Sequence, residues 1–157
     1  MLGDVLGEPL NRSESVRVDA FQQSDAVEVR RDVSKGRGAR GVYARRQIEA
    51  DELIERVPVI LIPKTQVFGT EYAAQQAARI SWYVFAWNVP TKREYVAIAL
   101  GYGSIYNHSF APNAVYRCVA PDAIEYVALR PIEPGEEVTV NYNGRPDDMT
   151  PMHFPMP

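Results

Sequence analysis

The chain has 157 residues and a formal net charge of −3, and 46% of its residues are hydrophobic, which favours one domain with a single core over two independent domains. A single cysteine, Cys118, excludes a disulfide framework within the chain and a multi-cysteine zinc cluster, so we expect no structural metal and a reducing compartment. No run of 18 apolar residues occurs, so we expect no membrane partner and a cytoplasmic location, or a nuclear one in a eukaryote.

The first half of the chain predicts short strands joined by loops. Residues 1–24 show no sustained hydrophobic period, so we expect a loosely ordered lead-in. Strands are predicted at residues 26–30 and 41–44, on either side of a basic, glycine-rich loop. The apolar and β-branched run 53–62 predicts a third strand.

Pro58 lies inside this third run. Because proline has no N–H to donate to a sheet, we expect it at a strand start, at a sheet edge or at a bulge. Residues 70–79 are rich in Ala, Gln and Glu and are the best helix candidate. The aromatic cluster in residues 82–87 that follows is expected to lie mostly in the core.

The second half of the chain predicts further strands. In the last of them, Val138, Val140 and Tyr142 alternate with polar residues and should share one apolar face. Many short strands with one helix indicate a mostly β domain built from small sheets. The predicted strands are residues 95–100, 114–119, 123–129 and 137–142.

Two polar strings stand out in this half: NHSFAPN, from Asn107 to Asn113, and GEEVTVNY, from Gly135 to Tyr142. Taken alone, the first is typical of an Asx-type turn ended by Pro112 and Asn113. Tyr142 has two interpretations: a core tyrosine with a satisfied hydroxyl, or a phenol that serves a reaction. A histidine-centred acid–base site is disfavoured, because the chain has two histidines and no nucleophile spaced as a partner.

The third string is the glycine-rich KGRGARGVYA, from Lys35 to Ala44. Its glycines would let backbone amides approach an anionic group closely. It is not a P-loop, because no Gly-Lys-Ser/Thr follows at the required spacing. The plain alternative is a hairpin loop whose arginines are solvated.

Together, in this order and spacing, the three strings resemble the SET-domain protein-lysine methyltransferases. The resemblance covers residues 26 to about 143 and points to the compact, stand-alone bacterial or viral type, since zinc-binding flanks are missing. It implies several small β-sheets, a C-terminal pseudoknot and a short helical insert. The implied SET domain spans residues 25–144. Two alternatives stay open for the tail 145–157, which either closes over the active site or is disordered.

The resemblance also implies a role for individual residues. Tyr142 stands at the position of the catalytic tyrosine, and the cofactor is S-adenosyl-L-methionine. Tyr116 and Val140 stand at positions that line the substrate channel. The implied cofactor contacts are Arg40, Gly41, Asn107, His108 and Phe154.

One position departs from the family pattern. The family's Gly-x-Gly falls on residues 39–41, and Ala39 tolerates a positive φ less easily than glycine. Either this position does not need a positive φ, or the family pattern falls on residues 36–38 instead. Of the two registers we favour the first, with Arg40 and Gly41 as the cofactor contacts of this loop.

The implied activity is methyl transfer to a lysine side chain in a protein, with a histone-like or other basic protein as partner. A homodimer is also implied by the viral relatives. Two alternatives stay open. One is a catalytically silent SET-like module that binds a lysine-rich partner. The other is a nucleic-acid-binding β domain that uses the basic loop, against which the acidic net charge counts.

Overall fold

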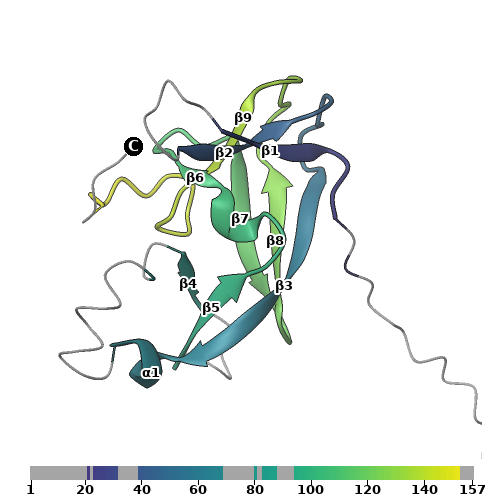
Figure 1. The fold of residues 1–157 in the computed structure, drawn as a ribbon. Coiled ribbons are helices and arrows are strands. Elements are labelled where there is room, and N and C mark those ends of the chain that lie inside the picture. The colour runs from purple at the N-terminus through teal and green to yellow at the C-terminus, as the bar shows by residue number, and fades with distance from the viewer. Residues whose placement is uncertain are drawn as a thin grey trace, which may run out of the picture.

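The computed structural model describes residues 21, 23–31, 39–68, 80, 83–87 and 94–152. They form a mostly β fold of two sheets (Figure 1). The strands are β1 (Val27–Arg31), β2 (Arg40–Ala44), β3 (Leu53–Pro63), β4 (Val84–Ala86), β5 (Tyr95–Ala99), β6 (Asn107–His108), β7 (Ala114–Val119), β8 (Ala123–Ala128) and β9 (Glu137–Val140). The helices are α1 (Lys64–Phe68) and a 3-10 turn, Gly103–Ile105.

The smaller sheet has the strand order β1-β2-β9-β6. β1 and β2, the strands on either side of the glycine-rich loop, pair antiparallel, and β2 continues onto β9. β9 then pairs in parallel with β6, a strand about thirty residues earlier in the chain. The prediction of a turn at Asn107–His108 was therefore wrong in one respect, because these two residues join a sheet. Their backbone groups find partners in a distant segment that local sequence does not reveal.

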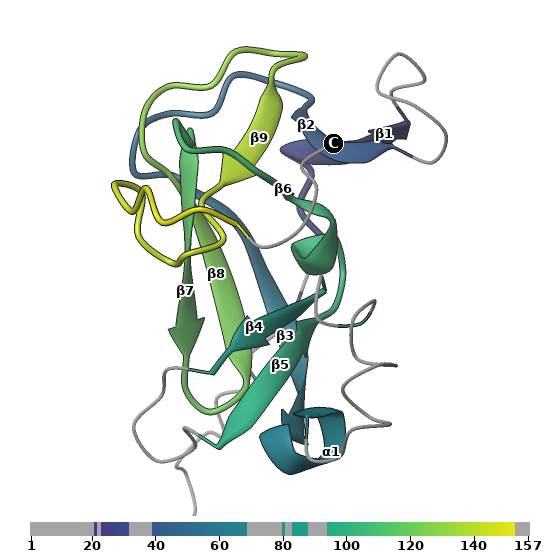
Figure 2. The ribbon, with the colours of Figure 1, turned by 90° about the vertical axis from the view of Figure 1, so that its left-hand side faces the viewer.

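The larger sheet has the order β4-β5-β3-β8-β7, and β3 is its central strand (Figure 2). Pro58 lies in the middle of β3, not at a strand start or an edge. The strand changes partners there, since it pairs with β8 as far as Pro58 and with β5 from Val59 onward. The irregularity in register falls instead between Leu53 and Glu55. A central strand thus tolerates proline at the point where its hydrogen-bonded partner changes from β8 to β5.

The helix predicted at 70–79 lies outside the described residues, as do residues 1–20 and 22 of the predicted lead-in 1–24, most of the glycine-rich loop and Phe154. The described helix α1 is five residues long and directly follows β3. None of the helices in the described ranges is long and apolar enough to span a membrane.

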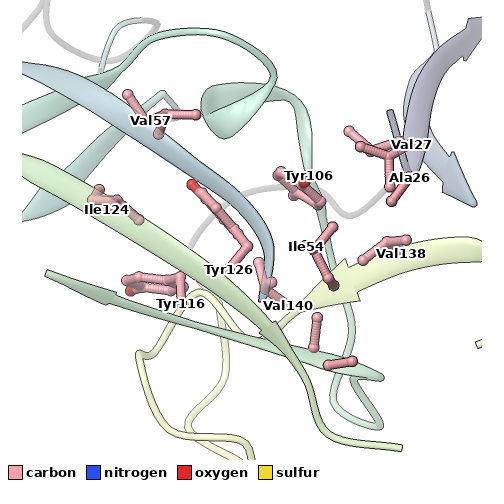
Figure 3. Packing of buried hydrophobic residues seen from close by; sticks show 14 of the residues in the cluster. Ala26, Val27, Ile54, Val57, Tyr106, Tyr116, Ile124, Tyr126, Val138 and Val140 are labelled. Atoms are coloured by element: carbon pink, nitrogen blue, oxygen red, sulfur yellow. The ribbon is translucent and has the colours of Figure 1, made fainter. Parts of the chain in front are cut away.

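Side chains from both sheets fill one core (Figure 3). Val138 and Val140 are fully buried, as the alternation in β9 predicted. Burial of an aliphatic side chain of this size stabilises the fold by about 1.5–3 kcal/mol. Two tyrosines, Tyr106 and Tyr126, are also fully enclosed, and their rings stack with centroids 4.2 Å apart. This core supports the short strands β6 and β9, which carry the polar motifs.

Candidate active site

The parallel pair β6 and β9 brings the two polar motifs together. Asn107 lies opposite Thr139, and His108 lies opposite Val140. One residue further on, the amide of Ser109 donates to the carbonyl of Val140 at 3.0 Å. The two segments that the resemblance implied would cross at the pseudoknot are therefore hydrogen-bonded neighbours.

Tyr142 lies two residues after the end of β9, and both its hydroxyl and its backbone amide are hydrogen-bonded. Its hydroxyl donates to the backbone carbonyl of Tyr106 at 2.7 Å, and its amide donates to Nδ1 of His108 at 3.0 Å. The rings of Tyr142 and His108 have centroids 5.2 Å apart. The phenol thus lies against Tyr106, the residue directly before Asn107, and so belongs to the same site as the first motif.

The phenol of Tyr142 is protonated at neutral pH. Burial, followed by the nearby Tyr83 and Glu137, raises the pKa of Tyr142 to about 12. A phenol with such a pKa is a poor general base. Its hydroxyl donates to the Tyr106 carbonyl, and a phenol oxygen that donates in this way can also accept a hydrogen bond, such as one from an amine. Tyr142 is therefore suited to orienting a nucleophile.

His108 is a structural histidine in this site. Nδ1 accepts the Tyr142 amide, so the neutral ring carries its proton on Nε2. Burial lowers the pKa of His108, which also favours the neutral form. Nε2 is buried and has no hydrogen-bond partner among the described residues, and Phe110 packs edge-on against the ring at 4.5 Å. An unpaired buried donor of this kind is where a bound ligand would supply an acceptor.

Asn107 joins three segments through its side-chain amide. Nδ2 donates to the carbonyl of Arg40 on β2 and to Oε1 of Glu137 on β9, both at 2.7 Å. A Cβ on Gly41 would run into the same carboxylate oxygen, so only glycine fits there without displacing it. The structure therefore brings the predicted residues Arg40, Gly41 and Asn107 together. Their roles toward the cofactor stay predictions.

Asn113 and Glu137 are two site residues that sequence reasoning missed. Asn113 is 2% exposed, donates to the carbonyl of Glu137 at 2.8 Å and accepts from the amide of Thr139 at 2.8 Å. It thus clamps β9 from the end of the first motif. The signal was present, because Asn113 closes the string NHSFAPN, but it was interpreted as the end of a turn.

Tyr116 reaches the site from β7 in the larger sheet. Its hydroxyl donates to the Tyr142 carbonyl at 3.2 Å, and Phe85 packs edge-on against its ring at 4.9 Å. Burial is the largest of the effects that raise the pKa of Tyr116 to about 12. Val140 is fully buried in the core. The channel roles of Tyr116 and Val140 stay predictions, and Phe154 lies outside the described residues.

Comparison with known proteins shows to which family a chain with this arrangement belongs. The family model of the SET domain matches residues 39–143, which include every site residue described above. The chain belongs to the SET-domain family. It is 31% identical over 118 residues to the histone-lysine N-methyltransferase of Schizosaccharomyces pombe specific for lysine 37 of histone H3, covering 74% of this chain and 72% of that protein.

A solved structure supports the SET fold independently. The crystal structure of a candidate histone methyltransferase from Plasmodium falciparum matches with a TM-score of 0.59, covering 78% of this chain and 95% of that one. At 21% identity, this likeness speaks for the fold alone. The family match and the curated relative support S-adenosylmethionine-dependent methylation of protein lysines and do not favour the silent binding module.

SET-domain methyltransferases use S-adenosylmethionine, and the residues present fit the polar groups of that molecule. Its amino acid part carries an ammonium and a carboxylate. Both N–H bonds of Asn107 are occupied within the protein, which leaves its Oδ1 to accept from an ammonium. The unpaired Nε2 of His108 and the exposed Arg40 supply donors. These residues therefore offer an acceptor for the ammonium of the cofactor and donors for its carboxylate.

Two arginines that flank the glycine-rich loop form ion pairs with acidic neighbours. Arg30 pairs with Glu28 at 2.7 Å, and Arg46 pairs with Glu52 at 2.8 Å. Neutralised arginines of this kind form a weaker phosphate-contacting stripe than free ones. This observation counts against the nucleic-acid-binding alternative.

Proposed function

We propose that this chain transfers methyl groups to a lysine of a basic, histone-like protein, with Tyr142 as the residue that orients the lysine amine. The single observation that carries the proposal is the hydrogen bond from the Tyr142 hydroxyl to the Tyr106 carbonyl. It places the phenol one residue from Asn107, so one small region holds both the amine-orienting group and the proposed cofactor contacts. Positioning of this kind supplies much of the rate enhancement in a displacement reaction.

The cofactor would be held by Asn107, Arg40 and His108. When bound, S-adenosylmethionine supplies an electrophilic methyl group that a neutral amine can take up. The chain's part is to present that amine. Surroundings of aromatic side chains, among them the buried Tyr116 and the partly buried Phe85, disfavour a charged ammonium by desolvation and so lower the pKa of an entering lysine. Tyr142 then accepts an N–H of the neutral amine and fixes its direction.

The proposed substrate class rests on two supports. The Schizosaccharomyces pombe relative acts on histone H3. The net charge of −3 on this chain favours the approach of a lysine-rich protein. A histone substrate would place the protein in the nucleus of a eukaryote.

A transfer assay tests the proposal. The chain is incubated with radiolabelled S-adenosylmethionine and core histones, alongside a panel of non-histone lysine-bearing proteins, with Tyr142→Phe as control. Label on a histone lysine, located by mass spectrometry and missing in the control, is the expected result. Tight binding of S-adenosylhomocysteine without transfer to any protein would instead indicate a silent module.

A further inference from the structure

Glu55 is a buried carboxylate in β3 that the proposed mechanism does not use. Its side chain is 3% exposed. Oε2 accepts from the hydroxyl of Tyr106 at 3.0 Å, and Oε1 accepts from the amide of Tyr102 at 3.2 Å. Within the described part of the chain, no cation contributes to its environment. An acidic group buried without a counter-charge costs free energy, so its place in the core calls for a reason.

The loop that leads into the first motif packs tightly on this carboxylate. Gly101 has φ +60°, and a Cβ on it would lie 2.8 Å from Oε1 of Glu55. At Gly103 a Cβ would lie 3.2 Å from the hydroxyl of Tyr126, which donates to the Gly103 carbonyl at 2.8 Å. The loop is thus held from two neighbouring strands, by Glu55 on β3 and by Tyr126 on β8.

Tyr106 transmits this constraint to the active site. Its ring stacks on Tyr126 at an angle of 14°, and both rings lie in the core in Figure 3. Its hydroxyl is held by Glu55, while its backbone carbonyl accepts the hydroxyl of Tyr142 at 2.7 Å. Because one residue carries both contacts, the position of its side chain helps to set the position of its carbonyl.

We propose that Glu55 is a positioning residue for methyl transfer. By binding the Tyr106 hydroxyl and the Tyr102 amide, it fixes the carbonyl that orients the phenol of Tyr142. The hydrogen bonds of Glu55 go to Tyr106 and Tyr102, and the carbonyl of Tyr106 accepts the hydroxyl of Tyr142, so the effect of Glu55 passes through Tyr106. The inference rests on the proposed role of Tyr142, and it adds that Glu55, through Tyr106, fixes the orientation of the Tyr142 phenol.

The kinetic test uses Glu55→Gln, Tyr106→Phe and the double variant, each assayed well below its own melting temperature. Misplacement of an orienting group lowers the rate of the bound complex, so we expect kcat to fall about ten- to hundredfold in each single variant. KM for the donor and for the protein substrate should stay within about twofold. Because the two residues act as one unit, the double variant should be no slower than the slower single variant.

The second readout needs no catalysis. Tyrosine labelled with ¹³C at the ζ carbon reports the hydrogen bonding of each phenol, and Tyr142→Phe identifies the Tyr142 resonance. We expect Glu55→Gln and Tyr106→Phe to shift this resonance, whereas Tyr95→Phe at the start of β5 leaves it in place. An unmoved Tyr142 resonance in both variants, or kcat losses that multiply in the double variant, overturns the inference. If the wild-type chain transfers no methyl group, the proposed function fails while the resonance test still decides the role of Glu55.

Discussion

The amide of Asn107 on β6 and the carboxylate of Glu137 on β9 are joined by a hydrogen bond of 2.7 Å across a parallel strand pair. The same amide holds the carbonyl of Arg40, so one side chain ties together the three segments that carry the family motifs. Gly41 leaves the space that the carboxylate occupies. The proposed cofactor site thus depends on two hydrogen bonds of a single asparagine and on the small size of Gly41.

Replacement of Asn107 by alanine should weaken donor binding. The change removes the Oδ1 acceptor and leaves the Arg40 carbonyl and the Glu137 carboxylate without their donor. Loss of one such hydrogen-bonded contact corresponds to about 1–3 kcal/mol, or roughly a five- to hundredfold rise in the dissociation constant. Calorimetry with S-adenosylhomocysteine measures it. An unchanged affinity in a variant that remains folded would remove Asn107 from the donor site.

Tyr142→Phe should separate binding from transfer. The ring keeps its packing against His108, but the oxygen that would accept an amine N–H is lost. We expect transfer to fall about a hundredfold or more and the affinity for S-adenosylhomocysteine to change by less than about twofold. The measurements are radiolabelled transfer and calorimetry on the same preparation. Full activity in this variant would refute the orienting role.

Gly41→Ala should act through Glu137. The added Cβ meets the end of a flexible side chain, so the carboxylate can move aside, but it then breaks its bond to Asn107. We expect a stability loss of only about 1 kcal/mol by urea denaturation, together with a weaker affinity for S-adenosylhomocysteine.

The matched control for Gly41→Ala is Glu137→Ala, alone and combined with it. The carboxylate that the new Cβ would meet is missing in both of these variants. Gly41→Ala should therefore have little further effect on affinity in the Glu137→Ala background. A further loss as large as that in the wild type would show that Gly41 matters for another reason.

The ion pair between Arg130 and Glu136 should make stability depend on pH. Arg130 donates to both carboxylate oxygens, at 2.6 and 3.3 Å, and is the first cause that lowers the pKa of Glu136 from its usual 4.5 to about 2. A depressed carboxyl pKa contributes stability that is present above the unfolded value and is lost as pH falls through the folded value. Stability from this pair should therefore decline between about pH 4.5 and pH 2.

The test of this pair is Arg130→Met. Because the pair is partly solvated, we expect the variant to be less stable by about 0.5–1 kcal/mol at pH 7. The difference between the two proteins should shrink as the pH falls below 4.5, where Glu136 of the variant takes up a proton first. Urea denaturation at pH 7, 5, 4 and 3.5 measures it. A difference that is constant across this range would assign the effect of Arg130 to packing.

Much of the fold was predictable from local pattern. The alternation of Val138 and Val140 with polar residues placed them correctly on a buried face, and the bounds of β7 matched the predicted range 114–119. These predictions succeeded for the same reason. The hydrophobic period of a strand and the turn residues that bound it lie within a few consecutive positions of the sequence. Pro58 and the turn predicted at Asn107–His108 were exceptions, since both depend on which strands lie beside them.

The sequence by itself determined the motifs, and through them the family, the proposed chemistry and the candidate residues Asn107, His108 and Tyr142. Only the tertiary structure decided how these residues meet. The parallel pairing of β6 with β9, the carbonyl of Tyr106 as the partner of the phenol, and the burial of Glu55 all join positions thirty or more residues apart. Such contacts are set by packing of the whole core, which leaves no local period for a reader of the sequence to find.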